Sequence, residues 1–366
     1  MSDQSSQVTP LFQKHIDSGA TMVNFGGWKM PVRYSGDKKE HFAVREHIGI
    51  FDVSHMGEIW VKGKNALPLL QYLTCNDVNT LYPGRIQYNV LMSRQGGAID
   101  DILIYCRNDK EYLVVVNASN QEKDFSWMKE NNRFNADISY ESENYAQIAV
   151  QGPKSIELMS ALAGTDLSGL KYYHFIEMEF QGFPVIISRT GYTASDGFEI
   201  YMAPGNAPVL WDILIEKGQP YQLIPCGLGA RDSLRVEGKM ILYGNDLNEE
   251  TTVLEAGLGW IVKLEKGEFI GRDVLLMQKE KGLTKKWVGF EMLDNGIPRH
   301  GYPVIQDGIK ISEVTSGVFS PTFNKPLGMA YLPIELTKTG SVIEIEIRKK
   351  LFKAQVVATP FYKIQR

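Results

Sequence analysis

The sequence predicts an α+β protein of two or three domains. At 366 residues the chain is longer than one ordinary hydrophobic core requires. Strand and helix patterns are mixed through the first three quarters of the chain. After residue 284 only short strand patterns separated by turns remain. The last part is therefore expected to form a compact β-barrel or sandwich.

Composition excludes several classes of protein. With 43% hydrophobic and 22% charged residues, the chain has the composition of a soluble globular protein. Its formal charge of -4 argues against binding to a nucleic-acid backbone, which favours a basic face. The polar opening "MSDQSSQVTP" has no signal or transit pattern, and no apolar run reaches membrane-spanning length. We expect a cytoplasmic protein, with the mitochondrial matrix as the open alternative.

The chain begins with a mixture of helix and loop. Residues 9–20 and 22–34 have this mixed character, and residues 37–50 read as a helix.

A more regular pattern follows from Gly57. We expect strands at 57–63, 86–92, 98–106, 111–117 and 136–140, and helices at 65–75 and 120–132. The strands at 86–92 and 98–106 form a hairpin across "SRQGG". Asn65 and Asn120 are the expected helix N-caps. This order of strand, helix, strands, helix and strand predicts a ferredoxin-like subdomain.

A second mixed region follows. Residues 145–164 join a strand to a helix with Pro153 at its first position. A strand meander is expected over 174–192 and 197–204, then helices over 206–218 and 226–240. Charged residues concentrate at 279–286, which favours a linker before the C-terminal strands.

Common cofactor motifs are absent from the sequence. "GLGARD" has two of the three glycines of a dinucleotide fingerprint, but Asp232 occupies the third position. The three cysteines and six histidines show no spacing typical of a metal site, so we expect no metal and three buried free thiols in a reducing compartment.

Two adjacent acids stand out in "GGAIDDILIY", residues 96–105. Neighbouring residues on a strand point to opposite faces, so one of Asp100 and Asp101 can meet water while the other points inward. In one interpretation, Asp101 is there because its side chain forms local hydrogen bonds to the backbone of the turn beside the two glycines. In the other, the apolar strand desolvates its carboxylate and makes it a stronger base or a stabiliser of a cation.

Glu199 and Arg231 are the other polar candidates. Glu199 shares a strand face with Tyr201, opposite Phe198, and this face is either solvated or the lining of a pocket. Arg231 lies early in a predicted helix, where the helix dipole opposes a cation. Its charge is balanced by Asp232 or Glu237, or by a bound ligand oxygen.

Three aromatic residues allow similar alternatives. Tyr88, Tyr192 and Trp260 either pack in a core or provide stacking platforms. From the residues alone, the prediction is an enzyme or binding protein with an aromatic and acidic cleft.

Several long motifs, in order, resemble the T-protein of the glycine cleavage system, an aminomethyltransferase family. They include "FGGWKMPVRY", "GIFDVSHMGE", "GGAIDDILIY", "SRTGYTASDGFEIY" and "GLGARDSLRVEGKMILYGND". The resemblance runs from about Pro10 to Tyr362 and implies a cloverleaf of three domains around a folate cavity. The expected domains are 1–52 with 144–278, the ferredoxin-like unit at 53–143, and the barrel at 284–366.

The family resemblance also implies a reaction. The one-carbon unit passes from the aminomethyl-lipoyl arm of H-protein to tetrahydrofolate, which releases ammonia and gives 5,10-methylenetetrahydrofolate. Asp101 corresponds to the catalytic acid of the family, and the implied folate-binding positions are Met56, Tyr88, Asn117, Tyr192, Glu199, Arg231 and Tyr362. Lys29, Arg33 and Lys38 either meet an acidic carrier protein or form a solvated face.

One departure from the family pattern is visible. The family usually reads "GYTGEDG", whereas this chain has "GYTASDG", with Ala194 and Ser195. If this position needs a positive φ, alanine strains the turn.

Other functions with the same fold fit less well. The iron–sulfur maintenance relatives, which bind folate without this catalysis, carry a Lys-Gly-Cys-Tyr motif where this chain reads "EGKMILYGND". Sarcosine and dimethylglycine dehydrogenases need a fused flavin domain that 366 residues do not accommodate. A purely structural module would not gather its motifs at loops and strand ends.

Overall fold

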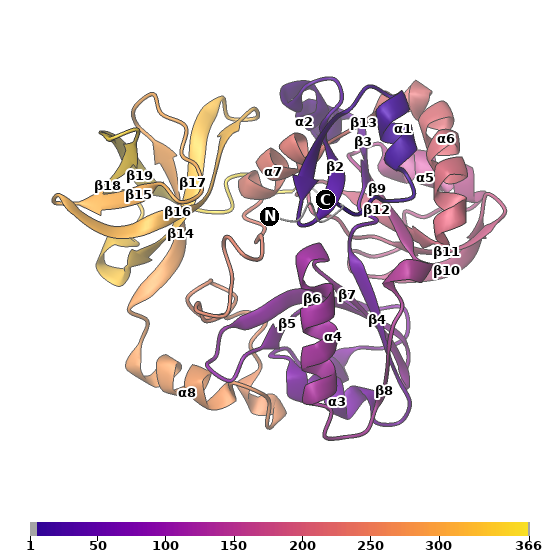
Figure 1. Cartoon of the computed structure of the whole chain (residues 1–366), viewed down its shortest axis with the longest axis horizontal. Coiled ribbons are helices and arrows are strands. Elements are labelled where there is room, and N and C mark those ends of the chain that lie inside the picture. Colours follow the sequence, from indigo (N-terminus) through magenta and orange to yellow (C-terminus); the bar gives the residue numbers. More distant parts are fainter. Residues whose placement is uncertain (1–5, 365–366) are drawn as a thin grey trace.

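The computed structural model describes residues 6–364, so residues 1–5 of the polar opening segment lie outside the described part. Its helices and strands form three lobes around a common centre (Figure 1). The three lobes contain a six-stranded mixed sheet, a five-stranded antiparallel sheet and a closed barrel. The predicted α+β cloverleaf with a ferredoxin-like unit and a C-terminal barrel is confirmed.

The first lobe contains residues from before and from after the ferredoxin-like unit. Its sheet has the order β10-β11-β12-β9-β3-β13, with bounds β3 (Ile48–Asp52), β9 (Ala146–Gln151), β10 (Phe175–Phe180), β11 (Phe183–Ser188), β12 (Gly197–Met202) and β13 (Leu223–Pro225). Around it lie α1 (Phe12–Asp17), α2 (Asp37–Glu46), α5 (Ser155–Ala163), α6 (Ala207–Gly218), α7 (Leu228–Glu237) and the hairpin of β1 (Thr21–Phe25) and β2 (Trp28–Arg33). Because β3 pairs with β9, the chain enters this lobe, leaves it and returns.

The second lobe has the ferredoxin-like order of elements. Its sheet runs β5-β6-β7-β4-β8, with bounds β4 (Gly57–Lys62), β5 (Ile86–Met92), β6 (Ala98–Asn108), β7 (Glu111–Val116) and β8 (Asp137–Tyr140). Two helices complete it, α3 (Ala66–Leu73) and α4 (Gln121–Glu130). Strands β6, β7, β4 and β8 are the four strands of a ferredoxin-like sheet, and β5 extends its edge.

The segment after α7 crosses to the second lobe. Its buried apolar side chains, which include Ile241, Val253, Ile261 and Leu275, pack into the same core as the five-stranded sheet. Helix α8 (Arg272–Lys281) ends this segment and leads to the barrel (Figure 1). Residues 279–281 therefore belong to a helix, and only residues 282–284 connect α8 to the first barrel strand.

The third lobe is a closed barrel in the order β14-β17-β16-β15-β18-β19. Its strands are β14 (Lys285–Met292), β15 (Pro303–Gln306), β16 (Ile309–Ser320), β17 (Lys325–Pro333), β18 (Val342–Ile347) and β19 (Lys350–Val357). Closure removes the exposed sheet edges that an open sheet of short strands would present. On the arrangement of these sheets, we propose the division into 1–52 with 144–278, 53–143, and 284–366, in which the segment after α7 is counted with the first domain although its apolar side chains pack on the second.

Some local expectations were wrong. Residues 22–34 contain the β1–β2 hairpin, and the helix expected over 37–50 ends at Glu46, before β3. Helix α5 begins at Ser155, so Pro153 lies in the turn ahead of it. Asn65 and Asn120 do occupy the N-cap positions of α3 and α4, as expected, but neither side chain caps its helix.

Candidate active site

A cavity of about 460 Å³ is lined by residues from all three lobes. This volume is within the range of small-molecule sites in proteins. Of the predicted site residues, those that line it are Met56, Tyr88, Asp101, Asn117, Tyr192, Glu199 and Arg231. Predicted site residues as far apart in the sequence as Met56 and Arg231 thus meet at one cavity.

Asp101 lies on β6, opposite Val90 of β5, and its carboxyl group lines the cavity. Tyr88 Oη donates to its Oδ2 at 3.1 Å, and Asn117 Nδ2 donates to its Oδ1 at 3.0 Å. Burial and the neighbouring Asp100 carboxylate raise the pKa of Asp101 to about 7, while the two hydrogen bonds lower it. A carboxyl group with a pKa near neutrality can accept a proton efficiently during catalysis.

Asp100 points to the other face of the sheet and is fully buried. Its carboxylate accepts hydrogen bonds from Asn117 N at 2.9 Å, Asn117 Nδ2 at 2.9 Å and Asn120 Nδ2 at 2.7 Å. Asp100 is therefore the acid that points inward, and Asp101 is the acid that is partly exposed, at the cavity wall, as the alternation of a strand predicts. The turn-chemistry interpretation of Asp101 fails, because its side-chain partners come from distant residues.

Glu199 lies on β12, a strand with partners on both sides. Thr190 Oγ1 donates to its Oε2 at 2.5 Å, and burial raises its pKa. Its face of the strand lines the cavity, whereas Phe198 on the other face is part of the hydrophobic core. The pocket interpretation of this strand face is the one that the structure supports.

Arg231 reaches the cavity from the first half of α7. Its guanidinium lies 4.8 Å from the ring centroid of Tyr192, and burial lowers its pKa. The expected counter-ions are bound elsewhere, since Asp232 pairs with Arg235 at 2.7 Å and Glu237 pairs with Arg45 at 2.8 Å. Within residues 6–364 no carboxylate forms an ion pair with Arg231, and its Nε has no hydrogen-bond partner. The remaining alternative, a ligand oxygen, fits this cation.

The aromatic candidates belong to the cavity wall. Tyr88 stacks on Trp260 with an interplanar angle of 14° and a centroid distance of 6.2 Å, and Trp260 is 65% exposed. Tyr192 donates its hydroxyl to Ile241 O, which fixes its ring beside Arg231. These rings can therefore provide flat surfaces to a planar ligand. Met56 packs at the edge of two small hydrophobic clusters and closes another part of the wall.

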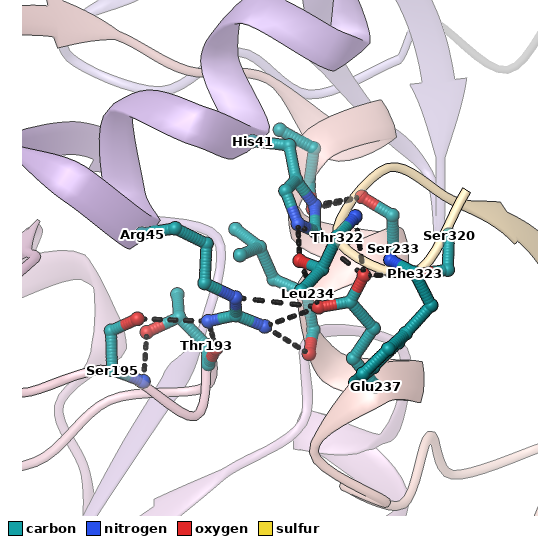
Figure 2. A network of polar contacts seen from close by, with 11 residues as sticks. His41, Arg45, Thr193, Ser195, Ser233, Leu234, Glu237, Ser320, Thr322 and Phe323 are labelled. Atoms are coloured by element: carbon teal, nitrogen blue, oxygen red, sulfur yellow. Dashed lines mark hydrogen bonds and ion pairs between the residues drawn. The ribbon is translucent and has the colours of Figure 1, made fainter. Parts of the chain in front are cut away.

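Tyr362 is placed differently from the other candidates. It lies outside the cavity wall, which the C-terminal segment reaches through Thr359 and Pro360 instead. Its ring lies 4.0 Å from the Arg45 guanidinium, and its backbone N–H donates to Glu237 O at 2.8 Å. Figure 2 shows that Arg45 itself bridges the loop of Thr193 and Ser195 to Glu237.

Gln147 is a wall residue that the sequence analysis missed. It is 2% exposed and lines the cavity, and its Nε2 donates to Tyr201 Oη at 3.1 Å, whereas its Oε1 has no donor. A signal was present, because "AQIAVQ" places Gln147 and Gln151 in a strand that is otherwise apolar and buried on both faces. An amide in such a strand needs partners, which a ligand can supply.

Other features of the structure bear on the excluded functions. Cys75, Cys106 and Cys226 are buried and free, as predicted. In the described part of the chain, no three His, Cys, Asp or Glu side chains gather as metal ligands would. None of the helices there is both long enough and apolar enough to cross a bilayer.

Comparisons with known proteins agree with this geometry. Residues 11–266 match the GCVT N-terminal domain, and residues 285–363 match the glycine cleavage T-protein C-terminal barrel domain. An aminomethyltransferase of Bacillus subtilis (strain 168) is 49% identical over 357 residues, covering 97% of this chain and 99% of that protein. One of Bacteroides thetaiotaomicron is 49% identical over 360 residues, covering 98% of this chain and 100% of that protein.

A solved structure shows the same fold. The crystal structure of glycine cleavage system aminomethyltransferase T from Bartonella henselae superposes with a TM-score of 0.90 at 32% identity, covering 98% of this chain and 99% of that one. The alternative of a non-catalytic iron–sulfur maintenance protein is not favoured, because the relatives matched over nearly their full length are aminomethyltransferases. The chain therefore belongs to the glycine cleavage T-protein family and is an aminomethyltransferase.

Proposed function

We propose that the cavity binds tetrahydrofolate and that Asp101 is the catalytic residue. The one-carbon unit would come from the aminomethyl-lipoyl arm of H-protein, with ammonia, the reduced lipoyl arm and 5,10-methylenetetrahydrofolate as products. The observation that carries this proposal is the Asp101 carboxyl group in the cavity wall, held by Tyr88 and Asn117 and with a pKa of about 7. A reaction that both creates positive charge and moves a proton needs such a group.

The chemistry explains why a carboxylate is required. Cleavage of the carbon–sulfur bond of an aminomethyl thioether is assisted by the nitrogen lone pair, and positive charge develops on the carbon–nitrogen unit. A fixed negative oxygen beside that unit lowers the barrier, because the site is already organised when the charge appears. The same oxygen can then accept the proton that the attacking folate nitrogen loses. Asp101 would therefore act both as electrostatic stabiliser and as proton acceptor.

The opposite part of the wall would hold the pterin. Glu199 can accept a pair of N–H donors from an amino-pyrimidine edge, since Thr190 occupies only its Oε2. Arg231 and the Oε1 of Gln147 offer an unpaired donor and an unpaired acceptor to the same ligand. Met56, Tyr192 and Tyr88 would contact the ring system, and Tyr362 would act from outside the wall through Arg45. No residue of the proposed mechanism is a metal ligand.

H-protein would bring its lipoyl arm to the cavity mouth, where Trp260 is exposed. The exposed Lys29, Arg33 and Lys38 are candidates for contact with an acidic carrier protein. We place the reaction in the cytoplasm, as expected from the sequence.

Product formation tests the proposal. Aminomethyl-loaded H-protein is incubated with the enzyme, and ammonia and methylenetetrahydrofolate are measured with and without tetrahydrofolate. We expect both products to form together and only slow ammonia release when tetrahydrofolate is omitted. Ammonia release at an equal rate without tetrahydrofolate would contradict the transfer, and H-protein without its aminomethyl group serves as the blank.

A further inference from the structure

A third buried acid lies behind the two acids of β6. Asp124 of α4 is fully buried, and neither of its carboxyl oxygens receives a hydrogen bond from any N–H or hydroxyl group in the described part of the chain. The carboxyl group of Asp100 lies beside it, close enough for a hydrogen bond between the two side chains. Two ionised carboxylates are both acceptors and repel each other, so a hydrogen bond between them requires a proton.

The surrounding donors decide which acid holds this proton. Asp100 accepts three N–H donors, from Asn117 N, Asn117 Nδ2 and Asn120 Nδ2, and these stabilise its ionised form. Asp124 accepts none, and burial together with the charge of Asp100 raises its pKa well above the usual range. Asp124 is therefore the neutral acid that donates, and Asp100 is the anion that accepts.

The pair is connected to Asp101 in two ways. Asn117 Nδ2 lies 2.9 Å from Asp100 Oδ1 and 3.0 Å from Asp101 Oδ1, so one amide group orients both carboxylates. The negative charge of Asp100 also raises the pKa of Asp101, second only to burial. Other titratable groups near the three acids are Tyr88, Tyr192, Tyr243 and Lys123, and among these only Lys123 is a cation.

We propose that Asp124 and Asp100 are positioning residues that share one proton, and that their single negative charge and the Asn117 bridge set the basicity of the Asp101 carboxylate. This inference rests on the proposed role of Asp101. With one charge held on Asp100, Asp101 stays close to the midpoint between its protonated and ionised forms at neutral pH. Without it, Asp101 would be a weaker proton acceptor.

Isosteric asparagine variants separate the location of the charge from the shape of the site. In Asp124→Asn, an amide N–H replaces the acid proton and the charge stays on Asp100. In Asp100→Asn, the amide donates to Asp124, so any negative charge that the pair keeps moves away from Asp101. In the double variant Asp100→Asn/Asp124→Asn, the pair carries no charge. The exposed Glu122→Gln on the same helix removes an equal charge at the surface and is the matched control.

The readout is the acidic limb of the pH profile of turnover, which reports the pKa of the essential base in the bound complex. We expect Asp124→Asn and Glu122→Gln to keep the acidic limb of wild type. In the double variant, the midpoint of this limb should fall by about one pH unit. The midpoint of Asp100→Asn should lie between those of wild type and the double variant. An unmoved limb in the double variant overturns the proposal. A limb in Asp124→Asn that moves as far as in the double variant also overturns it.

Infrared spectroscopy tests the shared proton without any turnover. About two pH units above the pKa of Asp101, where Asp101 is ionised, the wild-type spectrum minus the Asp124→Asn spectrum should contain the carbonyl stretch of a protonated carboxylic acid. Absence of that band contradicts a neutral Asp124. Because the band does not depend on Asp101, failure of the proposed catalytic role would leave this result unchanged, and the two failures can be told apart.

Discussion

Asp101 receives two hydrogen bonds that only a carboxylate can accept together in the observed geometry. Tyr88 donates to one oxygen and Asn117 to the other, so an asparagine in this position would turn its NH₂ group toward one of the two donors. Asp101→Asn therefore removes the charge and one acceptor while it keeps the volume of the side chain. The residue is suited to a test that separates chemistry from ligand binding.

For Asp101→Asn we expect turnover to fall by roughly 10²-fold or more, because proton transfer and charge stabilisation are both lost. Binding of tetrahydrofolate should stay within a few-fold, since Glu199 and Arg231 are unchanged. Single-turnover rates and equilibrium binding of tetrahydrofolate measure the two effects. Unchanged turnover would remove Asp101 from the mechanism.

The raised pKa of Asp101 also predicts a pH-dependent stability. Its folded pKa of about 7 lies above the usual value of 3.8 for an aspartate, so between these values the folded protein binds more protons than the unfolded chain. The contribution of Asp101 to stability is therefore present at acidic pH and is lost as pH rises through 7. The side chain of Asp101→Asn cannot ionise. The free energy of unfolding of this variant, minus that of wild type, should therefore be larger above pH 7 than near pH 4. Urea unfolding at the two pH values measures this, and an equal difference at both would contradict it.

The loop at 191–197 and helix α7 meet at a tight contact. Ala194 has a φ of 53° and is 9% exposed, so the alanine that replaces the usual glycine of the family does adopt a left-handed conformation. Such a conformation costs alanine roughly 1–2 kcal/mol. A Cβ added to Gly238, the C-cap of α7, would lie 2.5 Å from Ala194 Cβ. The neighbouring Ser195 accepts a hydrogen bond from Arg45 at 2.8 Å in place of the usual acid.

This contact gives a prediction for a double-mutant cycle. Gly238→Ala should lower the free energy of unfolding by roughly 1–3 kcal/mol, because the added methyl group has no space. In the Ala194→Gly background the same change should be milder by about 1 kcal/mol, because the opposing Cβ is gone. Chemical denaturation of the four proteins measures the coupling. Additive effects would show that the two positions do not clash.

Elements with strong periodicity could be predicted from the sequence. The alternating strands of the second lobe and of the barrel fall where the pattern places them, because each has one face in a core. The β1–β2 hairpin was missed because it lies at the surface and its burial does not alternate regularly. Asn65 and Asn120 stand at the N-cap positions, but their side chains do not cap the helices because each amide is used as a donor elsewhere, Asn65 to Phe134 O at 2.6 Å and Asn120 to Asp100. A pattern in the sequence cannot show which of two good partners an amide group meets.

Contacts between the lobes could not be predicted from local patterns. His41 of α2 contacts two other elements (Figure 2). Its Nδ1 lies 2.7 Å from Ser233 Oγ of α7, and its Nε2 lies 2.8 Å from Thr322 Oγ1 at the β16–β17 turn, 281 positions along the chain. Glu237 accepts hydrogen bonds from Ser320 and Thr322 in the same place. These residues carried no signal in the sequence, because their partners are chosen by the packing of whole lobes. Seven residues of the cavity wall could be predicted from the family motifs, but Gln147 and the bonds among Asp100, Asn117 and Asp124 could not.

Glu237 joins the first lobe to the barrel at a fully buried position. Its ion pair with Arg45 spans 2.8 Å, with side chains 0% and 5% exposed. Burial raises its pKa, but hydrogen bonds from His41 and Ser320 and the charges of His41 and Arg45 outweigh burial and lower the pKa to about 2. The stabilisation is therefore present above pH 4.5, the usual pKa of a glutamate, and is lost as pH falls through 2. The docking of the barrel should depend on this one carboxylate.

Glu237→Gln should lower the free energy of unfolding by roughly 3–5 kcal/mol at neutral pH, because it leaves the buried Arg45 without its counter-ion. The matched control is Glu291→Gln, which breaks the partly exposed pair with Lys325 at the barrel surface and should have an effect of about 0–1 kcal/mol. Denaturant unfolding measures both variants, and limited proteolysis at residues 282–284, the connection between α8 and the barrel, reports whether the barrel has become loose. Faster cleavage is expected only in Glu237→Gln. If the two variants lose the same stability, the barrel is held by its apolar contacts and the buried network does not determine its docking.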